Sequence, residues 1–362
     1  MRRRNRILRA LAAALLMIGL TGCWDQHPVE FRAPVAGIAI DPSKKPGEYL
    51  YTFLFPNVTT STSSLATTPS SDEFYSIQVQ ANSLTQALES AQLHQSRTLY
   101  LGQVRILCLS TKLPSSVWKR TILASSDSGR FVLTFWILAV PNAAKVLELT
   151  PPEEVVPDVA IYRALNCRCQ PIVWPGRAWR TWADLTTPGI SPTVSALSTS
   201  DGTFELGRIA VLGSHVSVWS PNATNGWAYL SGRVERDTMT ATLHHQTMTV
   251  GLIRGHTRLR VTREGMKVLV TAKLTYSGEL TAGFLGGDNA TLDKHVEADI
   301  AEQIHRAVAS AWREAHATDT DPMGFHRLGT WSDARISPAM NWKNWELHTV
   351  VRFTLRNEGV MR

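Results

Sequence analysis

Cysteine is scarce in this sequence, and its scarcity excludes a scaffold held together by many disulfides. Only four cysteines occur among the 362 residues: Cys23, Cys108, Cys167 and Cys169. The apolar run around Cys108 predicts a small buried core residue. Cys167 and Cys169 are separated by one residue, whereas zinc half-sites usually have two residues between the cysteines. One of this pair could form a disulfide elsewhere in the chain, which would leave one of the last three cysteines unpaired.

The sequence has no long hydrophobic run after its apolar N-terminal segment. After the first 20 residues, the most apolar stretch is Phe131 to Val140, which ends at Pro141. This short run predicts a buried strand, because a helix that spans a bilayer needs about 20 residues. We therefore expect no transmembrane helix after the N-terminal segment.

Most of the positive net charge of the sequence comes from residues 1–22. The net charge is +7, but residues 1–22 hold five arginines and no acid, which leaves 32 basic and 30 acidic residues. A nucleic-acid-binding domain would keep a basic surface in its folded part. We therefore expect no nucleic-acid partner.

No metal-binding or acid–base set of side chains is evident. His244 and His245 are adjacent, so on a strand they would face opposite sides. His256 has no nearby cysteine or acid to complete a ligand set, and we interpret these histidines as solvated strand residues. Glu153 and Glu154 lie among prolines, which predicts an exposed loop.

Nucleophile and phosphate-binding motifs are missing as well. Ser191 and Ser195 lack the G-x-S-x-G context of a nucleophile elbow. Gly283, with Gly286-Gly287, lacks the preceding strand, following helix and lysine of a phosphate-binding loop. We therefore expect a protein that is not an enzyme and that holds no metal or cofactor.

A lipoprotein signal is present at the N-terminus. Five arginines precede an uncharged apolar run from Ala10 to Leu20, and Leu20-Thr21-Gly22-Cys23 follows. A basic segment, a short apolar segment and small residues before a cleavage site predict a secretory signal peptide. The cysteine at the end resembles a bacterial lipobox, so we expect cleavage after residue 22, with diacylglycerol and an N-acyl chain on Cys23. The alternative is an ordinary signal peptide with a chance cysteine.

Strand and helix patterns alternate through the first 150 residues. Strands are predicted at residues 35–40, 49–55, 75–80, 104–109 and 131–140, and helices at 84–91, 117–123 and 142–149. Asn82 or Ser83 would cap the first of these helices. This alternation favours a mixed αβ layer. Residues 57–71 are nearly all Ser, Thr and Pro, so we expect an exposed loop there.

Residues 151–203 are rich in proline and predict an irregular connecting stretch. They contain Trp174, Trp179 and Trp182, which could stack on a ligand or partner, although core packing is as good an interpretation. Asp201-Gly202 indicates a boundary. We therefore divide the chain into a signal peptide at 1–22, an N-terminal domain at 23–200 with a possible second subdomain from 151, and a C-terminal domain at 201–362.

The C-terminal part has a different pattern. Short strands are predicted at residues 208–212, 216–219, 226–230, 259–262 and 267–276, followed by an amphipathic helix from Leu292 to Trp312 and a closing strand at 347–355. The whole chain thus predicts an α+β, multi-domain fold with mixed sheets flanked by helices. Its C-terminal domain would be a largely antiparallel sheet with one long packed helix.

The start of the predicted mature chain, Gly22-Cys23-Trp24-Asp25 with Glu30 nearby, resembles the Ger(x)C family of spore germination lipoproteins. Further likeness is spread along the chain, at residues 96–107, 127–131, 208–212, 226–230 and 321–329. The last of these segments resembles the family's Asp…Gly signature after a long helix. Gln26-His27-Pro28-Val29 departs from the charged residues usual after the Asp.

The resemblance implies the C subunit of a nutrient germinant receptor that is required for spore germination. Such a subunit would be lipid-anchored through Cys23 at the outer face of the inner spore membrane and would assemble with two integral-membrane subunits, of A and B type. The alternative is a solute-binding lipoprotein of an envelope transporter, which predicts two α/β lobes around a cleft. An envelope hydrolase would need a catalytic set that the sequence does not offer.

Overall fold

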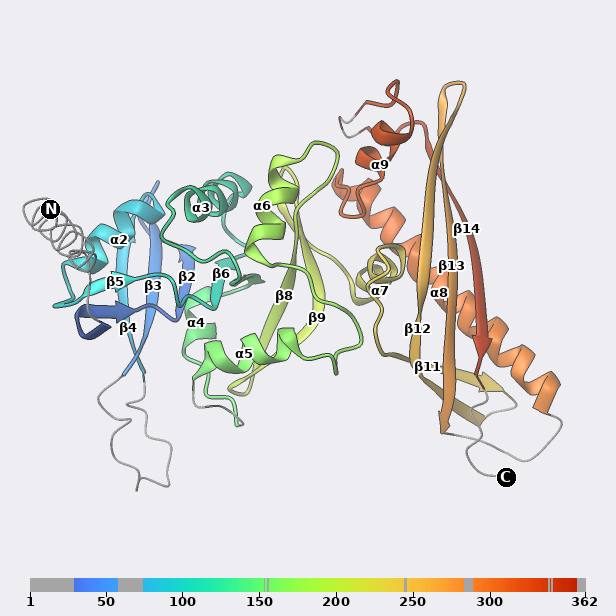
Figure 1. Cartoon of the computed structure of the whole chain (residues 1–362), viewed down its shortest axis with the longest axis horizontal. Helices are drawn as coiled ribbons and strands as arrows, with labels where there is room; N and C mark the ends of the chain where they lie inside the picture. Colours follow the sequence, from blue (N-terminus) through green and yellow to red (C-terminus); the bar gives the residue numbers. More distant parts are fainter. Residues whose placement is uncertain are drawn as a thin grey trace, which may run out of the picture.

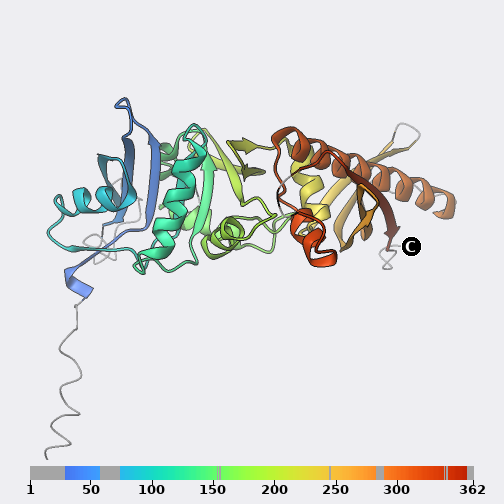
Figure 2. The same ribbon diagram turned by 90° about the horizontal axis from the view of Figure 1, so that it is seen from above.

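The computed structural model describes residues 29–57, 74–152, 154, 156–243, 246–282, 289–337, 339 and 341–356. Figures 1 and 2 show an elongated molecule in which two bodies, each built on one large sheet, follow one another along the long axis. We call them the N-terminal body, with an eight-stranded sheet, and the C-terminal body, with a four-stranded sheet. The α+β, multi-domain fold with mixed sheets flanked by helices is confirmed.

The N-terminal body contains a mixed sheet. In spatial order its strands are β10 (Val216–Val218), β9 (Thr203–Leu212), β8 (Thr193–Ser200), β7 (Trp136–Val140), β6 (Ile106–Ser110), β2 (Gly37–Pro42), β3 (Tyr49–Pro56) and β4 (Phe74–Ala81). The four central strands β8, β7, β6 and β2 pair in parallel, and the outer strands add antiparallel hairpins on both sides. A short helix, η1 (Val29–Phe31), precedes the separate parallel pair β1 (Arg32–Pro34) and β5 (Thr98–Tyr100).

Helices cover both faces of this sheet, as parallel central strands require. On one face lie α2 (Leu84–Gln92), α3 (Ser115–Asp127) and α6 (Ala178–Thr186), and on the other lie α4 (Ala143–Leu147) and α5 (Pro157–Asn166). The side chains of β6 alternate between the two cores: Ile106 and Cys108 face α4 and α5, whereas Leu107 and Leu109 face the opposite core. The predicted alternation of strands and helices is therefore confirmed.

Local capping explains where two of the predicted helices begin. The Ser83 hydroxyl accepts a hydrogen bond from the Gln86 N–H at 3.3 Å, which confirms one of the two expected caps of α2. Asn142 caps α4 in the same way. The buried Asp41 carboxylate also accepts hydrogen bonds from the first N–H groups of α4, so β2 and α4 are fixed to one another.

The C-terminal body packs one long helix on a twisted sheet. Its strands, in spatial order, are β11 (Asp237–Leu243), β12 (Gln246–Glu264), β13 (Lys267–Ala282) and β14 (Trp345–Leu355). The first three strands are antiparallel, whereas β14 runs parallel to β13. The helix α8 (Asn289–Thr318) buries a stripe at i, i+4 and i, i+3 spacing, formed by Val296, Ile300, Ile304, Val308 and Ala311. The predicted sheet and packed helix are confirmed.

One predicted strand is wrong. Residues 226–230 belong to the helix α7 (Pro221–Leu230), which begins with the cap Ser220 and with Pro221 at its first position. Every residue from Gly226 to Leu230 is buried, so the segment has no polar face from which a helical period could be recognised. Figure 1 shows α7 between the two sheets, where it packs against α8 on one side and β9 on the other.

The region 151–203 is more regular than predicted. It contains α5, α6 and β8, and its prolines mark boundaries: Pro157 occupies the first position of α5. The strand predicted at 131–140 is shortened to β7. Asp201 and Gly202 have positive φ angles and form the turn between β8 and β9, so the eight-stranded sheet continues through β10 beyond the boundary expected there.

Within the described ranges, no helix is long and apolar enough to cross a membrane. Most of the Ser/Thr-rich stretch predicted as a loop, residues 58–71, lies outside them. A last short helix, α9 (Phe325–Ser332), contacts β12 and follows the loop after α8. It lies where the two bodies meet.

Candidate functional site

Several residues singled out in the sequence lie outside the described part of the chain: Cys23, Glu153, His244, His245, Gly283, Gly286 and Gly287. Of the others, His256 is exposed on β12, and Glu154 forms an ion pair with Arg163 of α5. No group of three or more possible metal ligands occurs in the described ranges. The predicted lipid attachment to Cys23 therefore stays a prediction.

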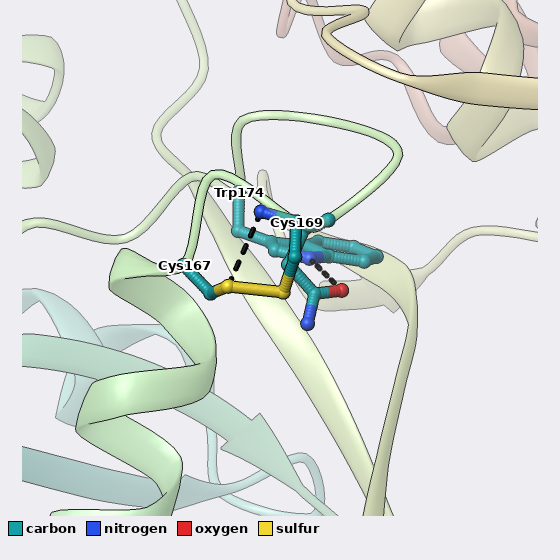
Figure 3. The surroundings of a disulfide bond; sticks show 4 residues. Cys167, Cys169 and Trp174 are labelled. Carbon is teal, nitrogen blue, oxygen red and sulfur yellow. Dashed lines mark hydrogen bonds between the residues drawn. A yellow bond between two sulfur atoms is a disulfide. The ribbon is translucent and has the colours of Figure 1, made fainter. Parts of the chain in front are cut away.

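Cys167 and Cys169 form a disulfide with each other, at the C-terminal end of α5 (Figure 3). The expectation that one of them would bond elsewhere is wrong, because a single intervening residue suffices to bring the sulfurs together. The Trp174 indole N–H points to the side chain of Gln170 beside this disulfide. Cys108 is the buried, unpaired cysteine that the sequence predicts, and burial raises the pKa of its thiol.

The three tryptophans of residues 151–203 do not form one patch. Trp174 is buried in the core shared with α5, Trp182 packs into the opposite core, and Trp179 is 50% exposed. Ser195 is buried, and its hydroxyl donates a hydrogen bond to the Pro175 carbonyl. Trp174 and Trp182 thus serve core packing, and Ser195 attaches the loop that contains Pro175.

A buried polar cluster joins the two bodies. Asp321, in the loop after α8, is fully buried, and its carboxylate accepts hydrogen bonds from the N–H groups of Gly324 and His326, both at 2.8 Å. The same carboxylate contacts the Nδ1 atom of His326 at 3.0 Å. Ser191, just before β8, donates its backbone N–H to the Asp321 carbonyl and accepts the Asp321 N–H on its hydroxyl. The segment 321–329 thus connects α8 and α9 to the N-terminal body.

Aromatic rings surround this cluster. His326 Nε2 accepts a hydrogen bond from the Asn341 N–H at 3.3 Å, so its proton lies on Nδ1, which donates to Asp321. Its ring lies 4.6 Å from that of Trp342 and 4.2 Å from that of Trp345. Burial, beside the rings of Trp342 and Trp312, lowers the pKa of His316. The cluster is therefore a packed, hydrogen-bonded support for the adjoining surface.

That surface is a cleft of about 640 Å³ between the two bodies, which we call the junction cleft. Four charged side chains line it: Arg180 and Asp184 from α6, Arg233 after α7, and Arg327 from α9. Asp184 lies 3.9 Å from Arg180 Nε and 4.0 Å from Arg327 Nη1. The contact with Arg327 crosses from one body to the other.

The electrostatics of the junction cleft reflect partial burial. Burial raises the pKa of Asp184, although Arg180, Arg327 and Arg233 all oppose this shift. Burial and repulsion by Arg180 lower the pKa of Arg233 to about 10, so it stays charged at neutral pH. Since Asp184 faces three arginines, the four side chains carry a net charge of about +2 at neutral pH.

Two of the arginines are held by aromatic rings. The guanidinium group of Arg233 lies 5.2 Å from the ring centre of Trp227, and that of Arg327 lies 5.3 Å from the ring centre of Trp331. Such cation–π contacts fix the planes of the guanidinium groups without using their N–H donors.

Sequence reasoning missed the junction cleft. Its charged residues come from three segments separated by about 50 and 90 positions, and only the fold brings them together. The i, i+4 spacing of Arg180 and Asp184 was the one local signal, and it is equally typical of an ordinary helix surface.

Comparison with known proteins was made on the sequence and on the fold. Residues 25–199 match the family model described as the spore germination protein N-terminal domain. None of the curated proteins matches the chain. The crystal structure of the GerBC protein is similar in fold, with a TM-score of 0.57 and 13% sequence identity, and the match covers 89% of this chain and 97% of that one. Residues 25–199 therefore form the N-terminal domain of a spore germination protein of the Ger(x)C family, and the chain as a whole shares the fold of the GerBC protein.

Proposed function

We propose that this protein is the lipid-anchored, non-enzymatic C subunit of a nutrient germinant receptor. The observation that carries the proposal is the family match, which begins at Asp25, directly after the lipobox and Trp24. The similarity in fold to the GerBC protein, which extends through the C-terminal body, supports it.

The proposed anchor is the lipid on Cys23. One acyl chain binds a membrane only weakly, whereas two or three chains give stable attachment. Anchoring confines the protein to the membrane plane and raises its effective concentration for neighbouring subunits. In this proposal the protein lies at the outer face of the inner spore membrane and assembles with two integral-membrane subunits, of A and B type.

The architecture favours a receptor subunit over a solute-binding lipoprotein of a transporter. The latter predicts two α/β lobes, but the C-terminal body is a sheet with β11, β12 and β13 antiparallel and one long helix on it. The buried Ser191, Asp321 and His326 hold the two bodies together through backbone groups, as a structural connection does.

Replacement of Cys23 tests this function in the native host. We expect Cys23→Ala to lose the acyl mass in mass spectrometry, to leave the membrane fraction and to abolish the loss of spore refractility after nutrient addition. Germination by non-nutrient treatments should persist. A Cys167→Ala, Cys169→Ala double variant is the matched control, because both cysteines are exposed, and it should stay membrane-bound.

Two results would contradict the proposal. If the Cys23→Ala protein remains in the membrane fraction with an unchanged mass, the lipid attachment is wrong. If the protein is released but nutrient germination proceeds at the normal rate, the receptor role is wrong.

A further inference from the structure

We propose that the junction cleft binds a small dicarboxylate, held by arginines from both bodies of the protein. This inference concerns the protein's own ligand and goes beyond the receptor-subunit role. It follows from the charge, the free hydrogen-bond donors and the walls of the cleft formed around Arg180, Asp184, Arg233 and Arg327.

The charge of the cleft calls for a dianion. Three guanidinium groups face one carboxylate, which leaves about two positive charges without a counter-charge among these four side chains. Charges that are partly withdrawn from water are costly unless they are paired. A ligand with two carboxylates would neutralise the excess, whereas a monovalent anion would neutralise only half of it.

The arginines keep donors for such a ligand. Asp184 lies 3.9 Å from Arg180 and 4.0 Å from Arg327, distances well above the 2.7–2.9 Å or so of a charge-assisted hydrogen bond. Each guanidinium group has five N–H donors in a fork that matches a carboxylate. The Arg233 Nη1 donates to the Val173 carbonyl at 3.4 Å, which leaves its other N–H groups for a ligand.

The walls favour an organic anion over an inorganic one. Trp227 and Trp331 line the cleft together with Leu230, Leu259 and Leu328, so the carbon chain of a dicarboxylate would contact apolar surface. The volume of 640 Å³ lies within the range of roughly 300–1,000 Å³ that is usual for small-molecule sites. Phosphate would meet the arginines but would leave these apolar walls unused.

The ligand would also connect the two bodies. Arg180 and Asp184 lie on α6 of the N-terminal body, whereas Arg327 lies on α9, which contacts β12 of the C-terminal body. Arg233 follows α7, and its carbonyl accepts a hydrogen bond from the Val173 N–H. A dicarboxylate that bridges Arg180 and Arg327 would add to the contact between Asp184 and Arg327 and to the hydrogen bonds between Ser191 and Asp321. Binding would thereby change how firmly the two bodies are held together.

The first test is titration calorimetry of the full chain, purified in detergent, at constant ionic strength. The probe is succinate, with inorganic phosphate and the uncharged succinamide as comparisons. We expect saturable binding of one succinate per chain, binding of phosphate weaker by about tenfold, and no binding of succinamide. Absence of saturable succinate binding, or equal binding of phosphate, would overturn the proposal.

Two variants with opposite expected effects separate recognition from damage to the fold. Arg327→Gln should weaken succinate binding about tenfold, through the loss of one charge-assisted hydrogen bond. Asp184→Asn should tighten it, because the resident carboxylate no longer competes for the arginines. Arg335→Gln is the control, since Arg335 is exposed and pairs with Asp333 away from the cleft, and binding should be unchanged.

The Asp184→Asn variant tests whether the arginines of the junction cleft bind succinate, even if the Arg327→Gln protein fails to fold. Weaker succinate binding by a folded Asp184→Asn protein would overturn the proposal. The experiment needs no spores, so its outcome is independent of the germination assay for Cys23.

Discussion

At the scale of single residues, Asp321 shows how much one buried carboxylate can organise. Three donors converge on it, the N–H groups of Gly324 and His326 and the Nδ1–H of His326. Only an acceptor with two equivalent oxygens satisfies all three, because an amide in the same place would turn a donor toward a donor.

We expect Asp321→Asn to lower the free energy of unfolding by about 1–3 kcal/mol, the cost of leaving a buried donor without an acceptor. Urea unfolding followed by tryptophan fluorescence measures it. Asp319→Asn, at an exposed position with a positive φ angle that asparagine tolerates, should change the stability little. Equal unfolding midpoints for the Asp321 variant and the wild type would show that this network is dispensable.

The sequence predicted single residues well only where a local pattern was sufficient. The buried Cys108 and the helix cap Ser83 could be predicted, because each depends on its immediate neighbours. Arg180, Arg233 and Arg327 could not, because only the fold brings α6, the segment after α7 and α9 to one cleft. Segment 321–329 was singled out through its resemblance, but its role as a connection emerged only from the partners of Asp321.

At the scale of elements, α7 and α8 show when the spacing of apolar residues is sufficient to predict a helix. One face of α8 is solvated, so its buried stripe was visible at i, i+4 and i, i+3 spacing. The last half of α7 is buried on all sides, and five buried residues in a row are as typical of a strand as of a helix. The cap signal Ser220-Pro221 was the local feature that distinguished the two.

The close packing of these two helices depends on Gly226. A Cβ atom built there would lie 2.0 Å from the Ala307 carbonyl oxygen of α8, far inside any permitted contact. We expect Gly226→Ala to force the helices apart and to destabilise the protein by about 1–3 kcal/mol, measured by urea unfolding. Asn225→Ala, on the exposed side of the same helix, is the control. A Gly226→Ala protein as stable as this control would refute the close approach.

At the scale of the whole molecule, the two bodies share a core. One hydrophobic cluster includes Leu138 of the N-terminal sheet, Trp227 of α7 and Leu274 of the C-terminal sheet. The order of elements could be predicted from the sequence, but their grouping could not, because a turn between two strands of one sheet resembles a linker. Asp201-Gly202 is such a turn, although the family model ends nearby, at residue 199.

Gly189 lies at the contact between the bodies. Its φ angle is +78°, and a Cβ atom there would lie 2.7 Å from the Arg327 nitrogen. We expect Gly189→Ala to loosen the contact and to increase the maximum dimension measured by small-angle X-ray scattering. Gly265→Ala shares the positive φ angle, but its turn has no neighbouring atoms within 4 Å, so it should lose some stability without a change in shape. Identical scattering from the Gly189→Ala and wild-type proteins would argue against a tight junction.

The burial of α7 has a consequence during protein synthesis. Its apolar side packs against α8, which is completed about 90 residues later in the chain. At a synthesis rate of roughly 5–20 residues per second, α8 is completed on the order of ten seconds after α7. During that interval the nascent chain exposes Trp227 and its apolar neighbours, so this segment in the middle of the chain is a binding site for chaperones that recognise apolar surface.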